Sequence, residues 1–226
     1  MKPNSSTRPT GRFPLLANGL SKIGKGVLLL FILSMAVIIS ISSIQHFFPY
    51  TKPSTFLQSK QAQYSIYLPA LYGHILTSGL ILFLGFLGFS QWIQAQYVHW
   101  HRRFGKVYVG LVLLISAPSA FVMAIYAHGG WSIKSCFVFL SILWWFFTWQ
   151  AWNSIRQKDI PSHRAFMLRS YALTLSAITL RWYSFFLGYF FSWYNLDSYV
   201  WVAWLSWVPN LVIVEIWIRK NRLSFS

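Results

Sequence analysis

The sequence predicts an all-α, polytopic membrane protein whose six transmembrane helices form a bundle. Of its 226 residues, 56% are hydrophobic, 20% are aromatic and only three are acidic. A water-soluble domain of this length needs far more charge to cover its surface. The apolar runs mostly extend over about twenty residues or more, which matches the ~30 Å hydrocarbon core of a bilayer. The sequence does not show the short alternating strands of outer-membrane barrels.

The apolar runs also set the expected domain organisation. A transmembrane domain is expected over residues 26–218, where the second to fifth spans form a four-helix core. A polar tail at 1–25 is expected to be cytoplasmic and disordered, and a short basic cytoplasmic tail follows at 219–226. The six expected spans are 26–48, 66–90, 105–127, 131–153, 164–190 and 199–218.

The distribution of the basic residues that give the net charge of +16 is explained by membrane topology. No nucleic-acid partner is therefore expected. With these spans, fifteen of the nineteen lysines and arginines lie in the two tails and in the connections around 102–106 and 156–169, and only three lie on the opposite side. The positive-inside rule then predicts a multi-pass membrane protein with both termini in the cytoplasm. The same basic residues are expected to contact anionic lipid headgroups of the bilayer.

One face of the fifth expected span carries polar groups along its whole length. At about 100° per residue, this stripe begins at His163 and reaches Arg181 after roughly five turns, or about 27 Å. Lipid does not select such a face, so we expect it to meet the bundle interior or a ligand. The stripe consists of His163, Met167, Ser170, Thr174, Ala177 and Arg181.

Two other ionisable residues lie inside expected spans. His74 lies roughly 12 Å below the outer edge of the second span if that span begins near Ile66. It is either hydrogen-bonded to a neighbouring helix or a ligand, since ionisable groups at this depth are costly and often functional. Glu215 lies four residues before Arg219 in the last span, a spacing that favours a local ion pair near the inner surface.

A short internal repeat places two histidines at comparable positions. His101 and His163 each open the pattern His-Arg-x-Phe at the start of a helix that runs outward from the cytoplasm. The positive end of the helix dipole and the adjacent arginines disfavour protonation, which leaves a neutral imidazole. Neutral imidazole is what a haem iron requires, and the arginines are able to hold haem propionates or a lipid phosphate.

These motifs resemble an uncharacterised bacterial family of membrane proteins known as domain of unknown function 2306. The resemblance covers roughly Leu71 to Arg181 and implies a polytopic inner-membrane protein, without assigning a reaction. It departs from the family pattern at Gly88-Phe-Ser-Gln91, where Gly-Pro-x-Gln is expected. The motifs that carry it are His101-Arg-x-x-Gly105-x-x-Tyr108, His163-Arg-x-x-Met167-x-Arg169 and Thr179-Leu-Arg181.

More distantly, a four-helix core with histidines at helix ends is similar to the diheme transmembrane cytochromes b. On that similarity the third and fifth helices supply His101 and His163 to one site on the inner side. An outer site would use His74, but the fourth helix has no histidine, so that site would be completed by His128 or by His46, or would stay incomplete. At best one intact bis-histidine site is therefore expected. The single cysteine provides no covalent haem-attachment motif, so any haem is of the b type.

Two functional hypotheses follow. The first is a haem b protein that moves electrons between a quinone or another donor and an acceptor. In this hypothesis His101 and His163 ligate the iron, and His74 and His128 are secondary candidates. The candidate cofactor-binding residues are His101, His163, His74, Arg102, Arg164 and Arg181.

The second hypothesis is a non-enzymatic membrane component that binds a lipid or a small anion, or an accessory subunit of a membrane complex. The starts of the two helices at His101 and His163, with the neighbouring arginines, provide a plausible anion site. An ion-coupled transporter is disfavoured because the core spans contain no acidic residue. A hydrolase is disfavoured because no Ser-His-Asp set is available.

Overall fold

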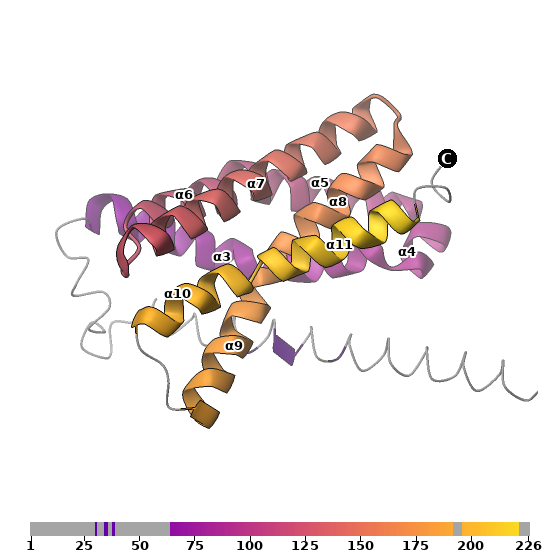
Figure 1. Cartoon of the computed structure of the whole chain (residues 1–226). Coiled ribbons are helices and arrows are strands. Elements are labelled where there is room, and N and C mark those ends of the chain that lie inside the picture. The colour runs from indigo at the N-terminus through magenta and orange to yellow at the C-terminus, as the bar shows by residue number, and fades with distance from the viewer. Residues whose placement is uncertain (1–29, 31–33, 36–37, 39–63, 192–195, 222–226) are drawn as a thin grey trace, which may run out of the picture. The chain divides into compact units, whose positions relative to one another are not determined.

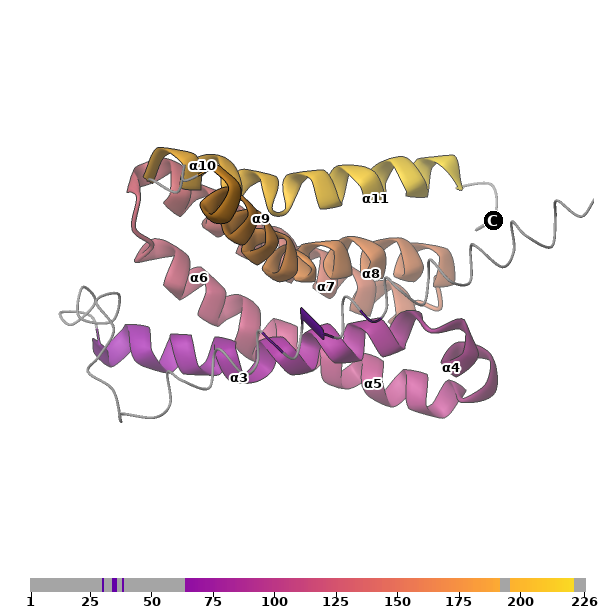
Figure 2. The ribbon, with the colours of Figure 1, turned by 90° about the horizontal axis from the view of Figure 1, so that it is seen from below.

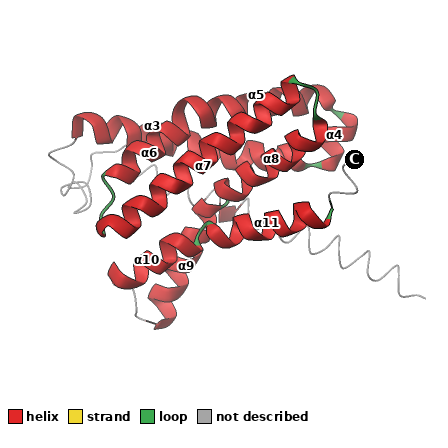
Figure 3. Ribbon diagram, turned by 45° about the horizontal axis from the view of Figure 1, so that its top comes forward, coloured by secondary structure: helices red, strands yellow, loops and turns green. Residues whose placement is uncertain are grey.

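The computed structural model describes residues 64–191 and 196–221, together with the helical positions Leu30, Ser34, Met35 and Ile38. Residues 1–35 and 36–226 form separate compact units, and all of the helices named here belong to the second unit. The first expected span and the N-terminal tail therefore lie almost entirely outside the described residues. All regular structure in the described residues is helical (Figure 3).

The helices follow one another with short connections (Figure 1). In chain order the elements are α3 (Tyr64–Phe89), α4 (Gln91–Gln96), α5 (Val98–Leu111), the π-turn η2 (Val112–Ser116), α6 (Ala117–Ile125), α7 (Gly130–Arg156), α8 (Ile160–Thr174), α9 (Ser176–Phe191), α10 (Leu196–Leu205) and α11 (Val208–Lys220).

A π-turn joins α5 to α6 without interrupting the helical path. Pro118 has no N–H to donate, and the wider turn just before it is marked by the bond from the Ala117 N–H to the Val112 carbonyl, five residues back. In this pattern the Leu113 carbonyl would accept from residue 118, where no donor exists. The indole Nε1 of Trp145 on α7 donates to the Leu113 carbonyl instead, at 3.2 Å. The proline is therefore accommodated by a neighbouring helix.

The turn between α7 and α8 is closed by a side-chain cap. Asp159 is the N-cap of α8, and its Oδ1 accepts a hydrogen bond from the Ser162 N–H at 3.0 Å. Hydrogen bonds from Ser162 hold the pKa of the Asp159 carboxyl below its usual range. The helix begins at Ile160, so Ser162 lies inside its first turn.

The fifth expected span is divided into two helices. α8 ends at Thr174 and α9 begins at Ser176, and α9 leaves the direction of α8 (Figure 1). Hydroxyls on both sides of Leu175 bond backward to carbonyls four residues earlier, from Thr174 to Ser170 at 3.0 Å and from Thr179 to Leu175 at 3.1 Å. Such bonds often accompany a bend in a helix, and Thr148 makes one within the continuous helix α7. The expectation of one straight five-turn stripe was wrong, because α9 leaves the direction of α8.

The α7–α8 hairpin lies in the middle of the packed helices. α3 packs against α5, η2 and α6, α6 packs against α7, and α11 packs against α8. Figure 2 shows α3 and α5 on one side of the α7–α8 pair and α11 on the other. The buried core lies between these helices and includes Ile81, Tyr108, Cys136, Trp144 and Tyr171.

Four helical stretches within the described residues are long and apolar enough to cross a membrane. α8 and α9 have 15 and 16 residues, and each alone is shorter than a bilayer requires. The structure therefore supports a helical membrane protein but does not confirm six spans. The four stretches are Ser65–Phe89, Val98–Ile125, Gly130–Arg156 and Ser198–Lys220.

A glycine on α3 permits the close approach of two tyrosines. A Cβ at Gly85 would overlap the Tyr171 ring and would lie 3.0 Å from Cε2 of Tyr108, whereas a Cβ at Gly88 would meet nothing within 4 Å. We expect Gly85→Ala to lower the free energy of unfolding by about 1–3 kcal/mol, the usual effect of overpacking a filled core. Thermal unfolding in detergent measures this difference. Gly88→Ala is the matched control and should not lower the midpoint; an equal loss in both variants would contradict the packing.

Candidate functional site

A buried chain of hydroxyl hydrogen bonds links α5, α7 and α8. The Tyr108 hydroxyl lies 2.9 Å from Ser170 Oγ and 2.8 Å from Thr174 Oγ1. Thr148 Oγ1 lies 2.7 Å from Ser170 Oγ, and the Trp144 indole donates to Thr174 Oγ1 at 3.0 Å. Ser170 and Thr148 have no exposed surface. In hydrocarbon each of these groups would be costly unpaired, so the network fixes how the three helices meet.

The polar stripe contributes to this network only in its middle part. Ser170 and Thr174 are buried and Met167 packs against the core, as a face turned to the interior requires. Thr148 and Trp144 were not predicted from the sequence, because their place in the network depends on how α7 packs against α8. Trp144 is buried. The signal in the sequence was the hydroxyl residue Thr148 four positions after Trp144. In the structure its Oγ1 donates to the Trp144 carbonyl at 2.7 Å.

Two histidines approach each other where α5 and α8 begin. His163 donates from Nδ1 to the Ala151 carbonyl on α7 at 2.8 Å, because a carbonyl only accepts hydrogen bonds. With the Nδ1–H used in this way, Nε2 is the nitrogen left to carry a lone pair when the ring holds one proton. His101 is within electrostatic range of His163. Its Nδ1 is a buried polar atom without a hydrogen-bond partner in the described part of the chain.

Positive charge surrounds this histidine pair. Arg102 and Arg164 both lie within electrostatic range of His101, and both side chains are exposed. The Gly88 carbonyl on α3 also interacts with the His101 ring. Two imidazoles, each held near a backbone carbonyl, and two accessible guanidinium groups therefore gather at one place. This arrangement is able to ligate a metal or to bind an anion.

His74 is engaged at a different place in the bundle. Its Nδ1 lies 3.1 Å from the Ser116 carbonyl and 3.3 Å from Ser116 Oγ, which links α3 to the π-turn. This is the helix-to-helix hydrogen bond that the sequence left open as one alternative. Arg181 lies within electrostatic range of His74. Among the described residues no group of three or more metal-ligating side chains occurs here or elsewhere.

Arg181 and His128 are not enclosed by the described helices. The Arg181 side chain is exposed and donates to the Ala177 carbonyl of its own helix at 3.0 Å. The far end of the stripe is therefore exposed at Arg181, which stays within electrostatic range of His74, and a role for Arg181 in binding stays a prediction. His128 is exposed in the turn before α7, and His46 lies outside the described residues.

Glu215 forms an ion pair between helices. Both of its carboxylate oxygens accept from Arg169 on α8, Oε1 from Nε at 2.5 Å and Oε2 from a terminal nitrogen at 3.1 Å. The sequence favoured a partner within the same helix, but the packing of α11 on α8 brings Arg169 to the carboxylate. The Arg169 guanidinium also lies over the rings of Phe166 and Phe147, at 5.1 and 5.8 Å from their centroids.

Long apolar helices around a hydroxyl network, with a histidine pair where two of them begin, define an integral membrane protein of the helical-bundle class. The chain belongs to the DUF2306 family of predicted membrane proteins, whose family model matches residues 71–218. The resemblance found in the motifs is thus confirmed and extends past Arg181. Comparison with curated proteins and with solved structures gave no match. The distant similarity to diheme cytochromes b gains no support from these comparisons.

The hydroxyl network predicts a specific loss of stability. Tyr108→Phe removes one oxygen and leaves Ser170 and Thr174 each short of one buried partner. We expect the free energy of unfolding to fall by about 1–2 kcal/mol. Chemical unfolding of the purified protein in detergent checks this. Tyr97→Phe, at an exposed tyrosine, is the control and should leave stability unchanged; unaltered stability of Tyr108→Phe would show that the network is not a source of stability.

Proposed function

We propose that this chain is a b-type-cytochrome-like membrane protein in which haem b is held between α5 and α8 by His101 and His163. The observation that carries the proposal is the hydrogen bond from His163 Nδ1 to the Ala151 carbonyl. Histidines that ligate metals commonly donate their other ring N–H to such a carbonyl, which fixes the tautomer and the ring orientation. Nε2, the nitrogen that ligates haem iron, is then available.

His101 supports the proposal through its unsatisfied nitrogen. A buried imidazole nitrogen with no partner costs free energy, and a ligand that engages the ring removes that cost. The unpartnered atom is Nδ1. Half a turn of the ring about the Cβ–Cγ bond brings Nε2 to the side that Nδ1 occupies. Ligation by His101 through Nε2 therefore requires this rotation, which gives up the interaction of the ring with the Gly88 carbonyl.

The arginines beside the pair have a defined role in this proposal. Arg102 and Arg164 are exposed and close to His101, and each guanidinium is able to bind one haem propionate through charge-assisted hydrogen bonds. A haem in this position exchanges electrons between a quinone or other donor and an acceptor. His74, Arg181 and His128 stay predictions for a second site, because they lie apart from this pair.

The proposal includes a membrane orientation. The basic connections place the starts of α5 and α8, and both chain termini, on the cytoplasmic side of a bacterial inner membrane by the positive-inside rule. Six spans result when residues 26–48 form the first span and α8 with α9 cross the bilayer together. A reporter fused after Ser226 should then be active in the cytoplasm.

A second function is favoured by the charges at the same site. Two exposed arginines and two histidines converge there, and such a group binds a phosphate or carboxylate in a non-enzymatic membrane protein or in an accessory subunit of a complex. This alternative needs no cofactor. It differs from the first in that the arginines donate hydrogen bonds to the anion, a protonated His163 adds its Nε2–H, and neither histidine ligates iron.

A reduced-minus-oxidised difference spectrum separates the two functions. We expect protein produced with haem available and purified in detergent to show the sharp bands of low-spin haem, and His101→Ala and His163→Ala to lose them, because each removes one axial ligand. His99→Ala, at an exposed histidine two residues away, is the control and should keep the bands. A colourless wild-type preparation would rule out the haem proposal and leave the anion site.

A further inference from the structure

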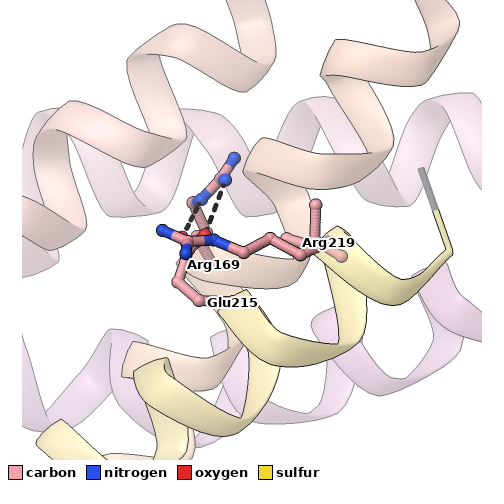
Figure 4. A pocket seen from close by; sticks show the side chains of 4 residues that line it. Arg169, Glu215 and Arg219 are labelled. Atoms are coloured by element: carbon pink, nitrogen blue, oxygen red, sulfur yellow. Dashed lines mark hydrogen bonds and ion pairs between the residues drawn. The ribbon is translucent and has the colours of Figure 1, made fainter.

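A cavity of about 450 Å³ lies between α8 and α11 and does not belong to the histidine pair. Its lining is Arg169 from α8 and Glu215, Ile218 and Arg219 from α11. Figure 4 shows the Arg219 side chain reaching toward the Arg169–Glu215 ion pair. The cavity thus combines three charged side chains with one buried apolar side chain, Ile218.

The charges in this cavity do not balance. Glu215 accepts two hydrogen bonds from Arg169, so one carboxylate compensates one guanidinium. Arg219 brings a second guanidinium to the same space, which leaves one positive charge in excess. Arg219 is exposed, so water screens part of its charge, and a bound anion would offset the remaining repulsion between the two guanidinium groups. Among the described residues that line the cavity Glu215 is the single acidic one, so a group with one negative charge would complete the charge balance of this lining.

The position of the cavity selects the kind of anion. Arg219 is the second-last residue of the candidate span Ser198–Lys220, which places it at the surface of a bilayer. The outer face of α11 beside the cavity is apolar and exposed, as lipid contact requires. Its exposed side chains are Val212, Ile213, Ile216 and Trp217.

We propose that this cavity binds the phosphate group of an anionic glycerophospholipid whose acyl chains lie along the exposed apolar face of α11. Arg219 donates charge-assisted hydrogen bonds to the phosphate oxygens. Arg169 stays bound to Glu215 and is fixed by its contacts with Phe166 and Phe147. The ion pair therefore keeps the cavity in shape and Arg219 supplies the binding charge. This site is independent of the proposed haem.

Native mass spectrometry of the full chain in a neutral detergent tests the proposal, with phosphatidylglycerol as the anionic probe and phosphatidylcholine as the zwitterionic one. We expect one phosphatidylglycerol to bind more tightly than phosphatidylcholine. Arg219→Gln should weaken that binding about tenfold, the loss expected for one charge-assisted hydrogen bond. Lys220→Gln removes the same charge from the next residue, which does not line the cavity, and should keep the affinity within about twofold. Equal losses in both variants would overturn the proposal.

Two further arms distinguish the sources of the phosphate and a loss of fold. Inorganic phosphate should not displace phosphatidylglycerol at equal concentration, because it lacks acyl chains; displacement would show a soluble phosphate site and overturn the lipid assignment. Arg219→Lys keeps the charge and should restore most of the binding. Arg219→Gln should also keep the thermal midpoint and any haem bands of the wild type. Failure of this site and failure of the histidine site are thus observed separately.

Discussion

The absence of competing water inside a bilayer is the constraint on which this structure depends. A hydroxyl in hydrocarbon must find its partner within the protein, and Tyr108, Thr148, Ser170 and Thr174 do so by bonding to one another across three helices. Apolar packing alone does not select one arrangement of these helices, since lipid tails are as apolar as leucine. The hydroxyl chain therefore determines which faces of α5, α7 and α8 meet. The positions of His101 and His163 follow from this arrangement, because the two residues lie on α5 and α8.

The same constraint explains how irregular backbone is tolerated. At the π-turn the Leu113 carbonyl accepts a hydrogen bond from the Trp145 indole, and the Ser116 carbonyl accepts one from His74. At Leu175 hydroxyls of the same chain segment bond back to the backbone. In each case a side chain supplies a hydrogen bond at a place where the helix is not regular. These polar residues lower the hydropathy of the spans, but their hydrogen bonds permit the helices to depart from regular α-helical geometry.

Sequence reasoning reached the class, the family and much of the polar face, because these follow from length, periodicity and local motifs. It placed Ser170 and Thr174 on one stripe and singled out His101 and His163 from a repeated motif. It did not find the partners supplied by other helices, such as Trp144 for Thr174 or Arg169 for Glu215, since these depend on which helices pack together. It also continued the stripe straight to Arg181, because a 3.6-residue period carries no information about a bend.

The break at Leu175 has a mechanical consequence. α7 is one uninterrupted helix of 27 residues, so its length is fixed, whereas α8 and α9 meet at a joint whose angle sets their combined span. Bilayers differ in thickness, and a rigid helix adapts to that difference by tilting or by deforming the lipid. If α8 and α9 cross the bilayer together, as proposed, a change of that angle would shift α9 and would leave the bond between His163 and the Ala151 carbonyl in place.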